Sequence, residues 1–240
     1  MDKYSWSDLF KIWTATYYSK PLLLICCALA LIVGLKLFRK EKSYLLFILY
    51  ILSSLLILIS IDLKIVKTHW SKSTTLTVEM GNTILALLEL IVFFDYFLKV
   101  LILKKLKLFI QICIVPFLIL IAAFFVKINI PKTSPHEIAS FSYKINVVEF
   151  FLLLIPCLGY FYEAFKIEKS DMLTSTPSFW IVMGLFVYCS VSLPFLLIGD
   201  NLQINNRLLY NLMFSIHYLS FTFLFLTLIK AFQCKKSLTA

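Results

Sequence analysis

Glycine and charged residues are scarce in this chain of 240 residues. Glycine occurs only 5 times, about 2% of the residues against about 7% in average proteins. Charged residues make up 15% of the sequence, whereas an ordinary soluble domain has about 25%. Hydrophobic residues reach 61%. Because so few charged side chains remain to cover a water-exposed surface, we exclude a soluble globular protein.

Motifs for nucleotides, metals and disulfides are also missing. Neither GxxxxGK[ST] nor GxGxxG occurs, so no phosphate-binding loop is predicted. The 6 cysteines form no CxxC pair, and five of them lie inside apolar runs, where cysteine packs as a small apolar residue. We expect no cofactor, no metal site and no disulfide.

The residues that membrane enzymes and cofactor proteins need are absent from the apolar runs. Haem ligation calls for paired histidines on facing helices, but His217 is the only histidine in such a run. Retinal needs a lysine in the middle of the last run, whereas Lys230 lies at its end. An intramembrane protease needs paired aspartates, a Ser/His pair or HExxH, and only Asp95 lies away from a run boundary. We predict that the protein is not an enzyme.

Long apolar stretches occupy most of the sequence. A helix rises about 1.5 Å per residue and the hydrocarbon core is about 30 Å thick, so about 20 mostly apolar residues cross it. Open strands would leave backbone groups unpaired in lipid, and these runs are too long and too uniformly apolar for a β-barrel. The sequence predicts an all-α polytopic transmembrane helical bundle with seven spans, at residues 21–38, 43–63, 80–103, 108–126, 145–165, 178–199 and 208–232.

The segment before the first predicted span differs from the spans. Residues 1–20 carry Trp6, Phe10 and Trp13 at helical spacing, with acidic and basic residues between them. This pattern predicts a short amphipathic interfacial helix. A secretory signal fits less well, because the segment is long, acidic and aromatic and no small-residue cleavage site follows it. The expected organisation is therefore an interfacial segment (1–20), a seven-helix transmembrane domain (21–232) and a short cytoplasmic tail (233–240).

The net charge of +10 comes mainly from lysines in short loops beside the apolar runs. That distribution is typical of contact with anionic lipid headgroups, so we expect the lipid bilayer as a partner and no nucleic acid. In the seven-span arrangement, 13 Lys and Arg residues fall on one side and 10 on the other. The positive-inside rule then places the N-terminus outside and the C-terminus in the cytoplasm.

The connections between the predicted spans are short. The longest runs from Lys127 to Lys144, about 18 residues, where a folded domain needs 50 or more. This excludes a nucleotide-binding domain, a kinase or a cyclase between the spans. Any effector is therefore expected to be a separate protein on the cytoplasmic side.

Ionisable and amide side chains inside the spans are the candidates for a functional site, since such groups are costly in lipid. Glu89 lies near the middle of the third predicted span, and Glu149 lies early in the fifth. A spacing recurs around them: Asn82 precedes Tyr96 by 14 residues, and Asn146 precedes Tyr160 by the same number. Either the two helices share an inward-facing polar seam, or the biased composition produces the repeat by chance. The candidate intramembrane polar site comprises Asn82, Glu89, Asn146, Glu149 and His217.

Two further polar features have alternative interpretations. Asp95 and Lys99 are four residues apart and predict an ion pair near the membrane boundary. His217 either serves a ligand or proton pathway, or hydrogen bonds to a neighbouring helix.

Four short stretches carry a resemblance: SKPLLL at 19–24, KSYLLFILYI at 42–51, PSFWIV at 177–182 and IHY followed by LIKAF at the close of the last run. With these stretches the chain resembles a group of small uncharacterised multi-pass membrane proteins of Bacteroidota. The resemblance implies a bacterial inner-membrane location and transfers no activity or site residue.

Two main hypotheses for function remain, with a structural or assembly role as a third. The first is a non-enzymatic sensor or partner-binding bundle that acts through a separate cytoplasmic protein. The alternative is a small-solute or ion carrier or channel that uses Glu89 and Glu149. Carriers commonly have broken helices rich in glycine and proline; here glycine is scarce, while Pro116, Pro156 and Pro194 fall within spans. The first hypothesis is therefore preferred.

Overall fold

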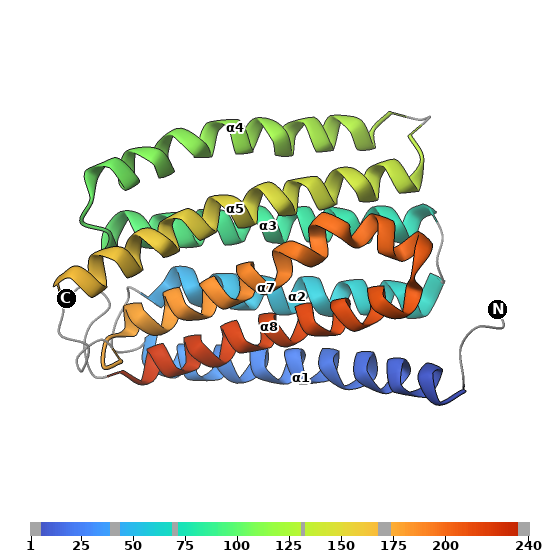
Figure 1. Ribbon diagram of the computed structural model, residues 1–240, viewed down its shortest axis with the longest axis horizontal. Helices are drawn as coiled ribbons and strands as arrows, with labels where there is room; N and C mark the ends of the chain where they lie inside the picture. Colours follow the sequence, from blue (N-terminus) through green and yellow to red (C-terminus); the bar gives the residue numbers. More distant parts are fainter. Residues whose placement is uncertain (1–5, 39–43, 69–71, 131–132, 168–173, 235–240) are drawn as a thin grey trace.

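The computed structural model describes residues 6–38, 44–68, 72–130, 133–167 and 174–234, with side chains for 19–36, 44–60, 76–130, 133–166, 174–199, 206 and 208–234. Over this part of the chain it contains helices and no strand (Figure 1). The all-α prediction is confirmed. The helices are α1 (Trp6–Phe38), α2 (Leu45–Thr68), α3 (Lys72–Val100), α4 (Lys104–Ile128), α5 (Pro135–Ile167), α7 (Pro177–Asn205) and α8 (Arg207–Gln233).

The helices extend beyond the predicted spans, most of all at the start of α5. The connection expected from Lys127 to Lys144 is shorter than predicted, because α4 continues to Ile128 and α5 begins at Pro135. A capping box causes the early start. The Ser134 amide donates to Glu137 Oε2 at 3.0 Å, and the Glu137 amide donates to Ser134 Oγ at 3.2 Å. Proline is favoured at the first position of a helix, so this stretch is helical although it is not apolar.

The predicted interfacial segment is not a separate helix. Residues from Trp6 to Phe38 form one helix, α1, which passes through Pro21. Proline is tolerated in membrane helices because neighbouring groups compensate for the lost backbone hydrogen bond. The side chains before Ser19, the first five residues and the tail from residue 235 lie outside the described part, so the amphipathic face and the tail stay predictions.

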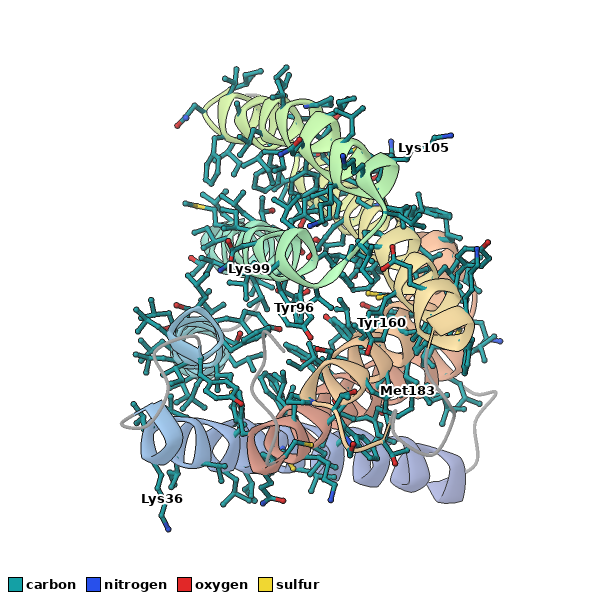
Figure 2. All side chains as sticks on the ribbon, turned by 90° about the vertical axis from the view of Figure 1, so that its left-hand side faces the viewer. Lys36, Tyr96, Lys99, Lys105, Tyr160 and Met183 are labelled. Carbon is teal, nitrogen blue, oxygen red and sulfur yellow. The ribbon has the colours of Figure 1, made fainter. Side chains whose placement is uncertain are left out.

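Six of the helices form a closed ring. Each helix packs against the next in the order α1, α2, α3, α5, α7, α8, and α8 packs against α1. α4 packs outside the ring against α5 and α3. Figure 2 looks along the bundle and shows α4 at its edge. Successive helices alternate in direction. We call the end where α1, α3, α5 and α8 begin the near end, and the end where α2, α4 and α7 begin the far end (Figure 1). The far end is the one that faces the viewer in Figure 2.

The outer surface of the bundle is apolar. Large hydrophobic side chains such as Ile25 on α1, Leu56 on α2 and Ile112 on α4 are 57%, 57% and 60% exposed. By length and composition, five of the described helices can cross a membrane: α1, through its part Ser19–Lys36, and α4, α5, α7 and α8. Leu45–Ser60 of α2 is a shorter apolar stretch. α3 is not among them; it carries three acidic residues in its described part, Glu79, Glu89 and Asp95. These features make the chain a membrane protein.

The far half of the ring is filled by aromatic side chains. Pairs such as Tyr44 and Phe232, or Phe47 and Tyr96, have ring centroids 5.0 and 5.3 Å apart. These residues are at most 5% exposed, so the far half of the ring is closely packed in the described part of the chain. We call this set the aromatic plug; it comprises Tyr44, Phe47, Phe93, Tyr96, Phe97, Phe225 and Phe232.

α7 and α8 approach each other closely at Gly184. A Cβ atom at this position would lie 1.8 Å from Thr227 Oγ1 and 2.9 Å from Thr227 Cβ. Only glycine therefore allows this packing, in the way that small residues commonly do between membrane helices.

Candidate functional site

A cavity of about 470 Å³ occupies the near half of the ring. Its lining comes from all six ring helices, from Lys20 of α1 and Leu58 of α2 to Tyr218 of α8. It lies between the aromatic plug and the near end. The cavity brings together the five polar residues singled out in the sequence, namely Asn82, Glu89, Asn146, Glu149 and His217.

A pair of carboxyl groups forms the deepest polar part of the cavity. Glu89 on α3 and Glu149 on α5 are each 1% exposed, and their carboxyl groups lie close to each other. The Tyr50 hydroxyl on α2 donates to Glu89 Oε1 at 2.7 Å. Since carboxylate oxygens are acceptors only, a direct hydrogen bond between the two carboxyl groups would need a proton on one of them.

The direction of the helices explains why these glutamates meet. α3 and α5 are neighbours and both begin at the near end. Glu89 and Glu149 lie about 25 and 21 Å along their helices at about 1.5 Å per residue, so they reach the same depth. One turn or two nearer the start, Thr83 Oγ1 and Ser142 Oγ lie 3.4 Å apart.

The repeated spacing in the sequence corresponds to this parallel pair. Glu89 and Glu149 are 60 positions apart, and Asn82 and Asn146 are 64 apart, a difference of about one helical turn. Both pairs therefore face the same way and line the cavity. Farther along the same helices, Tyr96 and Tyr160 lie between α3 and α5 in the interior (Figure 2).

Two buried oxygens of the cavity lining lack a hydrogen-bond partner. They are Glu149 Oε1 and Asn146 Oδ1, three residues apart on α5. Buried acceptors of this kind cost free energy when they are unsatisfied. Both atoms need a donor.

Aromatic side chains of α7 and α8 form one wall of the cavity. Tyr188 stacks on Phe221 with centroids 4.8 Å apart, and Phe195 lies 5.5 Å from Tyr210 and 5.8 Å from Phe214. His217 is part of this wall, with its ring 5.7 Å from that of Tyr188.

The neighbouring-helix interpretation of His217 is borne out by a hydrogen bond. His217 Nδ1 lies 2.8 Å from Ser192 Oγ on α7, and that hydroxyl lies 3.2 Å from Ser220 Oγ on α8. The imidazole is therefore held in place by the α7–α8 contact while one side of the ring lines the cavity.

Three further ionisable side chains line the cavity: Lys20, Glu79 and His136. Lys20 Nζ lies 6.0 Å from the centroid of the Tyr218 ring, a cation–π contact at the outer limit. The lining thus combines ionisable side chains, aromatic walls and the carboxyl pair.

The predicted ion pair is present but does not belong to this cavity. Lys99 Nζ and Asp95 Oδ2 are 2.5 Å apart. Their side chains are 55% and 39% exposed, near the far end of α3 (Figure 2).

Two important residues were missed by sequence reasoning. Tyr50 is one tyrosine in an apolar run, and nothing in its neighbourhood indicates that it faces Glu89. Glu163 lies near the end of its predicted span, and its carboxylate accepts from the backbone amides of Ile102 and Leu103 at 2.8 and 2.7 Å. It therefore closes the α3–α4 turn, where Leu103 provides no side-chain cap for α4.

Among the described residues, no group of three or more His, Cys, Asp and Glu side chains could hold a metal ion. The six cysteines are all free.

Comparisons of the chain with protein-family models, with curated proteins and with solved structures gave no match.

Proposed function

We propose that this membrane protein is a non-enzymatic sensor that takes a ligand into the near-end cavity and acts through a separate protein on the cytoplasmic side. In line with the resemblance noted above, we place it in a bacterial inner membrane. The observation that supports the proposal is a cavity that extends from Pro135, at the start of α5, to the Glu89–Glu149 pair.

The one-sided shape of the cavity favours binding over passage. The aromatic plug fills the ring beyond Tyr50, and its rings are almost fully buried. A ligand that enters from the near end therefore meets a closed floor, and the free energy of binding is available to shift the packing of the ring helices.

The short connections support a separate effector. At the far end, from Val100 of α3 to Lys104 of α4 and from Ile167 of α5 to Pro177 of α7, too few residues intervene for a folded domain. The basic far-end residues, including Lys36, Lys99 and Lys105 (Figure 2), suit an acidic partner surface or anionic lipid.

The test is the reach of water into the cavity. We would introduce Asn82→Cys, which lines the cavity, and Ile84→Cys, which is on the outer side of α3 and 39% exposed. The background carries Cys113→Ser and Cys234→Ser, because these two native cysteines are partly exposed and the other four are buried. A membrane-impermeant maleimide applied to the near end should label Asn82→Cys at least tenfold faster than Ile84→Cys. Equal rates, or no labelling at either position, would overturn the proposal.

A proton-coupled carrier is the second candidate, because a carboxyl pair that holds a proton can exchange it for a substrate. A carrier must also open at the far end. Cys157 lies on α5, about 12 Å beyond Glu149 toward that end, and is 0% exposed. If the impermeant maleimide labels Cys157 from the far end during turnover, and proteoliposomes take up solute in a manner that Glu89→Gln abolishes, the carrier replaces the sensor. Uptake that Glu89→Gln leaves unchanged removes this residue from the mechanism.

A further inference from the structure

We propose that the near-end cavity binds an organic amine in its ammonium form, with the ammonium group held at Glu149 and Asn146. This names the ligand class of the proposed sensor and rests on that proposed function.

The unpartnered oxygens give the first argument. Glu149 Oε1 and Asn146 Oδ1 are acceptors, lie three residues apart on α5, and are buried without a donor. Positions three apart share one face of a helix, and both residues line the cavity. A primary ammonium carries three N–H donors, so it can satisfy both oxygens at once. A carboxylate or phosphate ligand carries no such donor.

The charge of the lining gives the second argument. Three glutamates contribute to it, Glu79, Glu89 and Glu149, and the two deepest are 1% exposed. Lys20 is the only lysine or arginine among the described lining residues. An anion would have to approach a pair of carboxyl groups at low dielectric, whereas a cation is attracted there.

The aromatic wall gives the third argument. Tyr188, Phe214 and Phe221 contribute aromatic rings to the lining of the same cavity as the carboxyl pair. Ring faces attract cations, and the attraction strengthens where water is excluded. Aromatic rings also provide contact for an apolar body, so the wall suits an amine that carries a ring or a short hydrocarbon chain.

The size of the cavity limits the ligand. At about 470 Å³, it falls in the range of about 300–1,000 Å³ typical of small-molecule sites. The ammonium group can belong to a free amine or to the headgroup of an aminolipid, and the experiment below separates the two.

The experiment measures binding to the full chain in nanodiscs that contain phosphatidylglycerol and phosphatidylcholine but no aminolipid. The probes are phenethylamine and tryptamine, with 2-phenylethanol as the neutral analogue and 3-phenylpropionate as the anionic one. Isothermal titration, corrected with empty nanodiscs, should show binding of the amines at least tenfold tighter than of the alcohol and none of the carboxylate. Competition of the amines by added phosphatidylethanolamine would assign the site to the lipid headgroup, and its absence to a free amine.

Two variants test the assigned atoms. Glu149→Gln removes the charge, and Asn146→Leu removes the second acceptor at similar volume; each should weaken amine binding at least tenfold. The matched control is Glu137→Gln, which removes a carboxylate from the exposed first turn of α5, outside the lining. It should leave amine binding unchanged. Gel filtration and the thermal midpoint report folding, so if Glu149→Gln fails to fold, Asn146→Leu decides.

The outcomes separate this inference from the proposed function. If Asn82→Cys is labelled through water but the amines bind no better than the alcohol, or Asn146→Leu binds them as the wild type does, the amine assignment is wrong and water satisfies the two oxygens. The sensor proposal then stands. If the maleimide does not reach Asn82→Cys, the cavity is closed to ligands and both proposals fail.

Discussion

A carboxyl group in the middle of a membrane bundle costs free energy unless other groups compensate for its lost hydration. Glu89 accepts a compensating hydrogen bond from the Tyr50 hydroxyl. Glu149 lies close to Glu89, but its Oε1 atom is without a partner. The two glutamates are therefore unequal: Glu89 is held by Tyr50, and Glu149 has an acceptor left for a ligand.

At the residue scale, we predict that Tyr50 and Glu89 are energetically coupled. Tyr50→Phe removes the donor to Glu89 Oε1 and should lower the free energy of unfolding by about 1–3 kcal/mol, the usual cost of a buried acceptor left unsatisfied. In the Glu89→Gln background, the same change should cost at least 0.5 kcal/mol less, roughly the coupling of residues in contact. Unfolding in mixed micelles, followed by circular dichroism, measures both differences.

A position on the outer face of α3 provides the control for this double-mutant cycle. Ile91→Val on α3, a lipid-facing position 48% exposed, should show no coupling with Tyr50→Phe. Additive costs for Tyr50→Phe and Glu89→Gln would mean that the hydrogen bond contributes nothing to stability.

The sequence allowed the polar residues of the cavity to be identified, but not the contacts between them. Glu89, Glu149, Asn82, Asn146 and His217 could be selected because polar groups in apolar runs are few. Their meeting in one cavity depends on which helices are neighbours, and a sequence without tertiary contacts leaves that order open. The Tyr50 hydrogen bond could not be predicted, since a single tyrosine in an apolar run gives no direction.

At the scale of elements, α4 is attached to the ring by an interaction at its first turn. The carboxylate of Glu163 on α5 accepts from the amides of Ile102 and Leu103, which lie immediately before the first residue of α4. Backbone amides at a helix start need such acceptors. Hydropathy could not predict this contact because the partners are about 60 residues apart.

Removing the Glu163 carboxylate should loosen the start of α4. Glu163→Ala leaves two amides without an acceptor, so we expect a loss of about 1–3 kcal/mol in unfolding free energy. Hydrogen exchange at the Ile102 and Leu103 amides should become at least tenfold faster. Glu163→Gln keeps one acceptor, so its unfolding free energy and exchange rates should fall between those of the wild type and Glu163→Ala. Unchanged exchange in Glu163→Ala would show that these amides have another partner.

The contact of α7 with α8 depends on a missing side chain. Gly184→Ala places a Cβ 2.9 Å from Thr227 Cβ, and the overpacking should cost about 1–3 kcal/mol. Gly199→Ala on the same helix meets nothing nearer than Phe195 Cε2 at 3.8 Å, so it should be neutral or stabilise by up to about 1 kcal/mol. Thermal midpoints of the two variants, measured side by side, test the difference. Equal midpoints would contradict the close α7–α8 approach.

The start of α5 shows a different limit of sequence reasoning. The motif Ser134-Pro135-His136-Glu137 is a local helix-start signal, and it was available in the sequence. Hydropathy alone placed the start at residue 145, because the intervening residues are polar enough to resemble a loop. Local capping chemistry, not lipid solubility, decides where this helix begins.

At the scale of the whole molecule, we expect the two ends of the ring to lie on opposite faces of the membrane. Ile130 follows α4 at the near end and Thr174 precedes α7 at the far end, and both are exposed. From the distribution of Lys and Arg we expect the near end outside.

Labelling of these two positions tests both statements. In the Cys113→Ser, Cys234→Ser background, Ile130→Cys should react with an impermeant maleimide in intact spheroplasts. Thr174→Cys should react only after lysis. The reverse pattern would overturn the predicted orientation but not the fold. Labelling of both positions from the same face would contradict the helix directions.

Closure of the ring depends on the contact of α1 with α8, the earliest and latest helices of the structure. During synthesis on the ribosome, the helices enter the membrane in order, and the cavity has no complete wall until α8 is in place. Until then, Glu89 and Glu149 face a gap open to lipid. Chains that stall before α8 therefore display a polar defect within the bilayer, a feature that membrane proteases and chaperones can detect in unfinished proteins.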